Sequence, residues 1–321
     1  MKDKRILITG AHGFLGSHLA ASLRERGYRR LITPTRTECD FTQKQQMGRI
    51  FRRTRPQAVI HLAAKVGGIG ANRGNPGLFF YENLVMGVEL MEEARRKGVE
   101  KFVSIGTVCS YPKHAPVPFK ESGLWDGYPE ETNAPYGLAK KMLLVQAQAY
   151  RAQYDFNAIH LIPVNLYGPG DDFDPATSHV IPALIKKMCD AKARNHSSVT
   201  VWGDGSASRE FLYVEDCAEG IRLALEKYDK KEPVNLGSGR EIRIKALAEV
   251  IKRATGYTGK LVWDKTKPNG QLRRRLDVTR AAREFGFRAR MPFEEGLRKT
   301  VAWYERTRLS GGRRGPGSKA C

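Results

Sequence analysis

Apolar residues in the first half of the chain fall into short runs separated by stretches with helical spacing. The short runs, rich in Val, Ile and Leu, are the expected strands at 5–9, 31–33, 58–62, 101–105 and 158–162. Between them, apolar residues recur every three or four positions, as in Leu15, Leu19 and Leu23. Such an alternation predicts an α/β fold, in which a doubly wound parallel sheet of the Rossmann type carries helices on both faces.

The pattern loosens after about residue 166, where Gly and Pro become frequent. Further helices are expected at 181–193, 216–226, 244–253 and 293–304, which predicts a smaller, mostly helical C-terminal substrate domain. The predicted division is a cofactor-binding domain of 1–165 plus about 205–240, and a substrate-binding domain of about 166–204 and 241–308. Residues 309–321 lack apolar periodicity and are expected to be a disordered basic tail.

The chain is strongly basic, with 55 Lys and Arg against 34 Asp and Glu and a formal charge of +21. This charge favours an anionic partner, such as nucleic acid, an acidic membrane surface or a phosphorylated ligand. No apolar run is long enough for a membrane span or a signal peptide, so we expect a cytoplasmic location. The five cysteines are far apart and form no Cys-x-x-Cys pair, so neither a disulfide framework nor a metal site is expected.

A glycine-rich segment follows the first expected strand and opens the first expected helix. Gly10, Gly13 and Gly16 are spaced as G-x-x-G-x-x-G. Glycines at this place allow a tight turn and let backbone N–H groups approach a pyrophosphate at a helix N-terminus. The segment therefore predicts a dinucleotide site that includes Phe14 and Leu15.

Arg36 lies 20 residues beyond Gly16, where NAD-binding chains carry an acid for the ribose 2′-hydroxyl. A guanidinium suits a 2′-phosphate, because it offers paired, charge-assisted hydrogen bonds. We therefore predict NADP(H) as the cofactor, with Asp40 bordering the adenine. The alternative is that Arg36 is a solvated surface arginine.

Tyr136 and Lys140 are four residues apart, which places both side chains on one face of an expected helix. A lysine cation favours phenolate and is expected to lower the pKa of the tyrosine, giving a proton donor or acceptor near neutral pH. Thr107 follows the fourth strand, where its hydroxyl can bind a carbonyl oxygen. The expected cofactor contacts at the ends of the fourth and fifth strands are Ile105, Pro163 and Asn165.

The glycine loop, the hydroxyl and the Tyr-x-x-x-Lys pair, in this order, resemble the extended short-chain dehydrogenase/reductase family over roughly residues 4–306. Four segments are similar to GDP-L-fucose synthases within that family, namely 66–72, 109–113, 165–169 and 178–185. The resemblance implies a GDP-4-keto-6-deoxy sugar as the substrate class. It implies that NADPH-dependent 3,5-epimerisation and 4-keto reduction convert GDP-4-keto-6-deoxy-D-mannose to GDP-L-fucose. It also implies a homodimer joined through helices at about 78–97 and 136–153.

The same resemblance implies a role for each matching residue. Cys109 and His179 would be the base and the acid of the epimerisation. Tyr136 would protonate the C4 oxygen, Lys140 would position the nicotinamide ribose, and Thr107 would bind the C4 oxygen. The implied substrate contacts are Lys187, Trp202, Arg209 and Asn269.

Three features depart from the family pattern. Thr107 stands in place of the usual serine, His12 in place of an arginine in the glycine loop, and 272–275 differ from the usual Gly-x-Pro-Arg-Lys run. Two alternative functions stay open: a reductase or epimerase acting on a related GDP-4-keto hexose or heptose, and a non-catalytic basic Rossmann protein that binds nucleotides or nucleic acid. A 4,6-dehydratase is disfavoured, because Val108 and Cys109 occupy the positions of its Asp-Glu pair.

Overall fold

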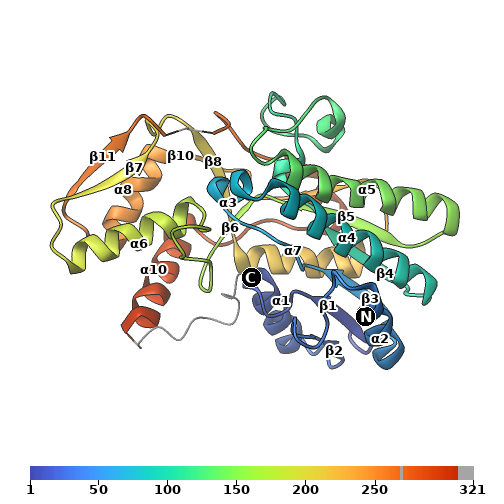
Figure 1. Ribbon diagram of the computed structural model, residues 1–321. Helices are drawn as coiled ribbons and strands as arrows, with labels where there is room; N and C mark the ends of the chain where they lie inside the picture. Colours follow the sequence, from blue (N-terminus) through green and yellow to red (C-terminus); the bar gives the residue numbers. More distant parts are fainter. Residues whose placement is uncertain (268–269, 310–321) are drawn as a thin grey trace.

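The computed structural model describes residues 1–267 and 270–309 and is built around a parallel sheet of six strands (Figure 1). The strand order is β2-β1-β3-β4-β5-β9, so the direction of winding reverses between β1 and β3. These strands are β1 (Ile6–Thr9), β2 (Leu31–Ile32), β3 (Ala58–His61), β4 (Lys101–Ile105), β5 (Ala158–Pro163) and β9 (Val234–Leu236). The doubly wound parallel sheet predicted from the sequence is confirmed, and ligands of such sheets bind at the carboxyl ends of the strands near the reversal.

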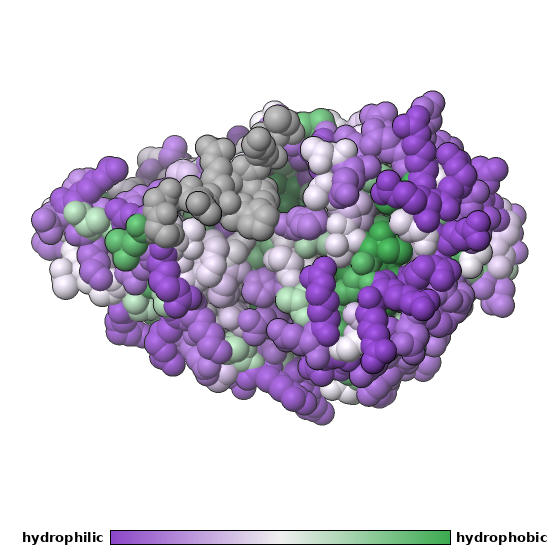
Figure 2. All heavy atoms as spheres, turned by 90° about the horizontal axis from the view of Figure 1, so that it is seen from below, coloured by the Kyte–Doolittle hydropathy of each residue, from purple (hydrophilic) through white to green (hydrophobic). Residues whose placement is uncertain are grey.

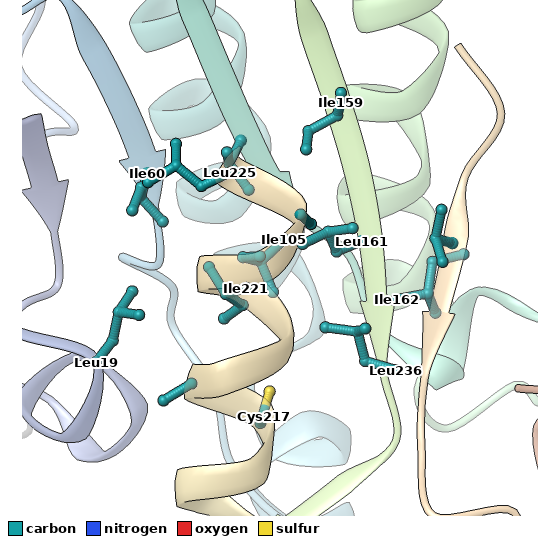
Figure 3. Close-up of a cluster of buried hydrophobic side chains, with 14 of the residues drawn as sticks. Leu19, Ile60, Ile105, Ile159, Leu161, Ile162, Cys217, Ile221, Leu225 and Leu236 are labelled. Carbon is teal, nitrogen blue, oxygen red and sulfur yellow. The ribbon is translucent and has the colours of Figure 1, made fainter. Parts of the chain in front are cut away.

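Helices cover both faces of this sheet, which explains why all of its strands except β2 are buried along their whole length. On β1, Ile6 and Ile8 enter one hydrophobic cluster and Leu7 enters the other. Figure 3 shows Cys217, Ile221 and Leu225 of α7 facing side chains of the sheet. The helices of the two faces are α1 (Phe14–Glu25) with α7 (Val214–Lys227), and α2 (Lys44–Thr54) with α4 (Pro76–Arg96) and α5 (Ala134–Tyr154).

The C-terminal part surrounds a third hydrophobic cluster and contains strands that were not predicted. The predicted helices are present as α6 (Val180–Ala193), α7, α8 (Ile244–Thr255) and α10 (Phe293–Leu309). The unpredicted strands are β6 (Asn165–Tyr167), β7 (Ser198–Trp202), β8 (Ser208–Tyr213), β10 (Glu241–Arg243) and β11 (Lys260–Asp264), and β9 of the central sheet was not predicted either. The strands outside the central sheet form the sheets β10-β8-β6 and β11-β7. Most are too short, or alternate too strongly between exposed and buried residues, to give an apolar run.

Short elements complete the chain: α3 (Ile69–Gly74), α9 (Thr279–Phe285) and the 3-10 turns η1 (Val108–Ser110) and η2 (Glu121–Trp125). Helix α10 extends to Leu309, so the first residue of the expected tail is helical, and 310–321 lie outside the described residues. No helix in the described part of the chain is long and apolar enough to cross a membrane.

Nearly all of the excess positive charge lies at the surface. Figure 2 shows a face that is mostly hydrophilic. Among the described residues, the buried cations are Lys101, Lys140, Lys141 and Arg274. Burying a charge is unfavourable unless it is compensated, so these four residues require individual explanations.

Candidate active site

The glycine loop leaves no room for side chains, as a phosphate cradle requires. Gly10 has φ +69°, and a Cβ on it would lie 2.7 Å from the backbone nitrogen of Ala63. A Cβ on Gly16 would lie 2.0 Å from the carbonyl oxygen of Gly10. Gly13 caps the N-terminus of α1, where Phe14 and Leu15 begin the helix. The first N–H groups of α1 therefore lie at the carboxyl end of β1, a position in which they could bind a pyrophosphate.

Arg36 lies beyond the carboxyl end of β2, next to this loop. Its side chain is 59% exposed, and Nη2 lies 3.7 Å from Oδ2 of Asp40. His12 directs Nε2 to the carbonyl oxygen of Thr33 at 2.9 Å, so it contributes to holding the segment that leads to Arg36. The structure thus places Arg36 and Asp40 together, with the guanidinium accessible to an anion.

Thr107 and Tyr136 meet at the carboxyl end of β4. Thr107 is buried, and its Oγ1 accepts a hydrogen bond from the Cys109 backbone N–H at 3.2 Å. Tyr136, from the first turn of α5, shares a hydrogen bond with the Thr107 side chain. Ile105 ends β4 and Pro163 ends β5, so both lie at the same edge of the sheet.

The pKa of Tyr136 shifts in the opposite direction from the prediction. Burial raises it, the charge of Cys109 raises it further, and only the hydrogen bond with Thr107 lowers it. The charge of Lys140 does not lower it. Lys140 is itself only 2% exposed, and burial lowers its pKa to about 8. The expected lowering of the tyrosine pKa by Lys140 is therefore wrong for the protein alone, and the phenol is held in its protonated form.

Cys109 lies in the middle of η1 and is half-buried. Its sulfur accepts a hydrogen bond from Nη1 of Arg274 at 3.6 Å. Helix α5 reaches this turn through Gly137, because a Cβ there would lie 2.4 Å from the Cys109 carbonyl oxygen. Ser110 donates its hydroxyl to the Gly137 carbonyl at 2.9 Å and ties the two segments together.

His179 occupies the N-cap position of α6, but its side chain does not cap the helix. The segment before it packs against the chain near Gly68, whose N–H donates to the carbonyl of Thr177 at 2.7 Å. His179 as a residue is exposed, yet burial of its imidazole ring by the surrounding protein lowers its pKa. The charge of Asp172 opposes this shift and the charge of Arg274 adds to it, so neutral imidazole is favoured.

The predicted substrate residues separate into two places. Trp202 is 58% exposed, so it is no core residue, and Nζ of Lys187 lies 5.5 Å from its ring centroid. Nζ of Lys267 lies 5.7 Å from the same centroid. Arg209 is instead half-buried on β8, close enough to Cys109 for the thiol charge to affect its pKa, which burial lowers to about 10. Asn269 lies outside the described residues.

The side-chain amide of Asn165 donates to the carbonyl of Glu210 at 3.0 Å. Sequence reasoning missed Gly137 and Arg274 as parts of the site. Gly137 lies inside the Tyr-x-x-x-Lys segment, whereas Arg274 comes from a loop 165 residues beyond Cys109. No group of His, Cys, Asp and Glu in the described residues could hold a metal ion.

Comparisons with known proteins identify the family of the chain. The model of the NAD dependent epimerase/dehydratase family matches residues 6–237. GDP-L-fucose synthase 1 of Arabidopsis thaliana is 40% identical over 303 residues, which are 94% of each chain.

Two solved structures are similar over nearly the whole chain. A GDP-L-fucose synthetase from Naegleria fowleri bound to NADP has a TM-score of 0.88 at 27% identity, covering 98% of this chain and 97% of that one. A GDP-6-OMe-4-keto-L-xylo-heptose reductase from C. jejuni also has a TM-score of 0.88 at 27% identity, covering 96% and 99%. The chain therefore belongs to the NAD dependent epimerase/dehydratase family.

Proposed function

We propose that this chain converts GDP-4-keto-6-deoxy-D-mannose to GDP-L-fucose by NADPH-dependent 3,5-epimerisation and 4-keto reduction. The observation that carries the proposal is the meeting of Thr107, Cys109 and Tyr136 at the carboxyl end of β4, with His179 nearby. This set combines a hydroxyl for a carbonyl oxygen, a protonated phenol and two proton-transfer groups. A simple reductase needs only the first two.

The cofactor role rests on the cradle at the start of α1. Backbone N–H groups beyond Gly10 and Gly13 would hold the pyrophosphate, and Arg36 would hold the 2′-phosphate. When bound, NADPH supplies the hydride for C4 of the sugar. Lys140 would orient the ribose from the floor of the site, because its side chain is buried and lies one helical turn after Tyr136 on α5.

In the epimerisation, the C4 ketone makes the neighbouring C–H bonds acidic. The Cys109 thiolate takes the proton, an S–H bond forms, and the electron pair of the broken C–H bond passes into an enolate. Thr107 donates a hydrogen bond to the enolate oxygen, which stabilises the developing charge. His179 returns a proton to the opposite face. Because the protein favours neutral His179, this step should be faster at lower pH.

In the reduction, the oxygen at C4 gains a proton as the hydride reaches the carbon. Tyr136 is suited to donate this proton, because burial and the charge of Cys109 raise its pKa and keep the phenol protonated. The hydrogen bond with Thr107 fixes the direction of the hydroxyl. One hydroxyl pair thus serves both stages of the reaction.

The decisive experiment incubates the protein with GDP-4-keto-6-deoxymannose and NADPH in deuterated water and identifies the product by NMR. We expect GDP-L-fucose with deuterium at C3 and C5. Cys109→Ser and His179→Asn should lose deuterium incorporation and keep NADPH affinity. A product with unchanged C3 and C5 would contradict the double epimerisation, and wild-type exchange in either variant would remove that residue from its role.

The second candidate is a reductase acting on a related GDP-4-keto heptose. It is favoured by the similarity to the C. jejuni heptose reductase. The same experiment, repeated with a GDP-4-keto heptose, separates the two by substrate preference. A purely nucleic-acid-binding role is disfavoured, because it would give no reason for a buried Lys140 or for a guanidinium facing Cys109.

The homodimer is part of the same proposal. Helices α4 and α5 pack side by side, and α4 exposes apolar side chains, with Tyr81 62% exposed. Val145 is an exposed apolar residue of α5. Pairing of these faces between two copies would bury them in a four-helix interface. Light scattering should give a dimer for the wild type and a monomer for Val145→Glu combined with Tyr81→Lys.

A further inference from the structure

One buried cation of the described chain has no carboxylate partner. Of the four buried cations, Lys101 lies 2.8 Å from the carboxylate of Asp229, and Lys141 binds the carbonyl of Leu124 beside the ring of Trp125. Lys140 has its place beside the proposed cofactor. Arg274 is only 8% exposed, and no carboxylate in the described part of the chain lies within ion-pair distance of it.

Arg274 is held rigidly in this position. Its carbonyl accepts a hydrogen bond from the Glu210 backbone N–H at 3.0 Å, so its segment runs beside β8. Two residues further, the Leu276 N–H donates to the Glu210 carboxylate at 2.6 Å. The Arg274 side chain donates from Nε to Oε1 of Gln271 at 3.1 Å. These bonds direct Nη1 towards the sulfur of Cys109.

Other charged and titratable groups around Cys109 come from three more elements. Arg209 of β8 adds a second cation, and Tyr136 of α5 adds a protonated phenol. His179 at the start of α6 also responds to the charge of Arg274. Cys109 therefore lies where guanidinium groups meet, and among the described residues its sulfur is the group in contact with Arg274 that can carry a balancing negative charge.

We propose that Arg274 is a positioning residue that holds Cys109 as a thiolate before any substrate binds. Its effect on the reaction rests on the proposed function, whereas its effect on the thiol can be measured in the free protein. The thiolate is the reactive form of cysteine in proton abstraction and in alkylation alike. A bound diphosphate would satisfy Arg274 equally well, so the test is made without substrate.

The experiment measures iodoacetamide alkylation of Cys109 between pH 6 and 10, in the absence of substrate, by mass spectrometry of its peptide. We compare the wild type with Arg274→Met, Arg274→Lys and Arg273→Met. Arg273 is the matched control, because this neighbouring arginine is exposed and pairs with Glu241 at 2.7 Å. Unfolding by urea verifies that each variant is folded.

We expect Arg274→Met to slow alkylation at pH 7 by at least about tenfold. The limiting rate at high pH should stay within about twofold of wild type, because there every thiol is ionised and only access to the sulfur matters. Arg274→Lys should keep most of the rate at pH 7, and Arg273→Met should keep all of it. If Arg274→Met is not folded, the alkylation profile of Arg274→Lys against Arg274→Gln decides the question.

An alkylation rate in Arg274→Met that equals the wild-type rate at every pH would overturn the proposal. A rate lowered equally at all pH values would also overturn it, because that result means blocked access instead of lost charge. If the pH-7 rate falls as expected but the wild type exchanges no sugar protons with deuterated water, the thiolate pairing holds and the proposed function fails. If the wild type does exchange sugar protons, the kcat of this exchange should fall in Arg274→Met by the same factor as the alkylation rate.

Discussion

Gly137→Ala tests whether the close approach of α5 to η1 sets the distance between Tyr136 and Cys109. A Cβ at residue 137 would lie 2.4 Å from the Cys109 carbonyl oxygen and 3.3 Å from the Ser110 backbone nitrogen. Ordinary van der Waals contact begins at 3.4 Å. Since both neighbours are backbone atoms, no side-chain rotation relieves the overlap, and the two segments must separate by about 1 Å.

Gly137→Ala should lower both the free energy of unfolding and kcat. Alanine favours a helix over glycine by about 1 kcal/mol, whereas overpacking costs about 1–3 kcal/mol and straining the bond from Ser110 to the Gly137 carbonyl about 1 kcal/mol. We therefore expect a net loss of about 1–3 kcal/mol. A misplacement of about 1 Å between reacting groups lowers a rate by roughly 10²-fold. The effect on kcat, equivalent to about 2.7 kcal/mol, should thus match the upper end of the loss in stability.

The assay combines kcat for ketone reduction, the Kd for NADPH and unfolding by urea. Gly77→Ala is the control, since a Cβ at that helical position meets nothing within 4 Å. The control should keep full activity and gain at most about 1 kcal/mol. The NADPH Kd of Gly137→Ala should stay near wild type, because the glycine loop is unchanged. Wild-type kcat in Gly137→Ala would refute the argument that this contact sets the catalytic geometry.

Three further changes test single groups. Arg36→Ala should raise the KM for NADPH at least about tenfold and leave the KM for NADH unchanged, since only NADPH carries the 2′-phosphate. Lys140→Met should exceed the wild type in stability by about 3 kcal/mol at pH 7, as judged by urea unfolding. Burial lowers the pKa of Lys140 to about 8 from its ordinary value of 10.5, so between these two pH values the unfolded chain binds one more proton than the folded chain. The free energy of unfolding of the wild type therefore rises with pH over this range, and its difference from Lys140→Met should disappear. Trp202→Ala should raise the KM for the GDP-sugar roughly tenfold with little change in kcat, and an unchanged KM would place the nucleotide elsewhere.

The sequence predicts the nucleotide-binding half well for a physical reason. Strands such as β1 and β4 are buried on both faces, so their apolar runs are continuous and easy to identify. The glycines of the cradle are likewise visible, because backbone approach admits no other residue. The small sheets β10-β8-β6 and β11-β7 could not be predicted in this way, since an exposed face leaves alternating residues such as those of β7.

The candidate site shows the same division between local and long-range information. The spacing of Tyr136 and Lys140 is fixed within one helix, so their shared face is predictable. The direction of the Tyr136 pKa depends on burial and on Cys109, and neither is visible in the helix itself. The contact from Arg274 to Cys109 requires the strand-like pairing of its segment with β8, which brings together residues 165 positions apart.

The charge of Cys109 links the two proposed stages of the reaction. While the sulfur is an anion, it raises the pKa of Tyr136 and keeps the phenol protonated. Once Cys109 has taken a proton from the sugar, that anion is gone, and Tyr136 becomes a stronger acid at the moment when reduction needs one. Arg274 sets the strength of this coupling, because a guanidinium 3.6 Å from the sulfur offsets the field that reaches the phenol. Removing it should therefore change the pH dependence of the reduction as well as that of the epimerisation, although Arg274 donates no proton to the C4 oxygen.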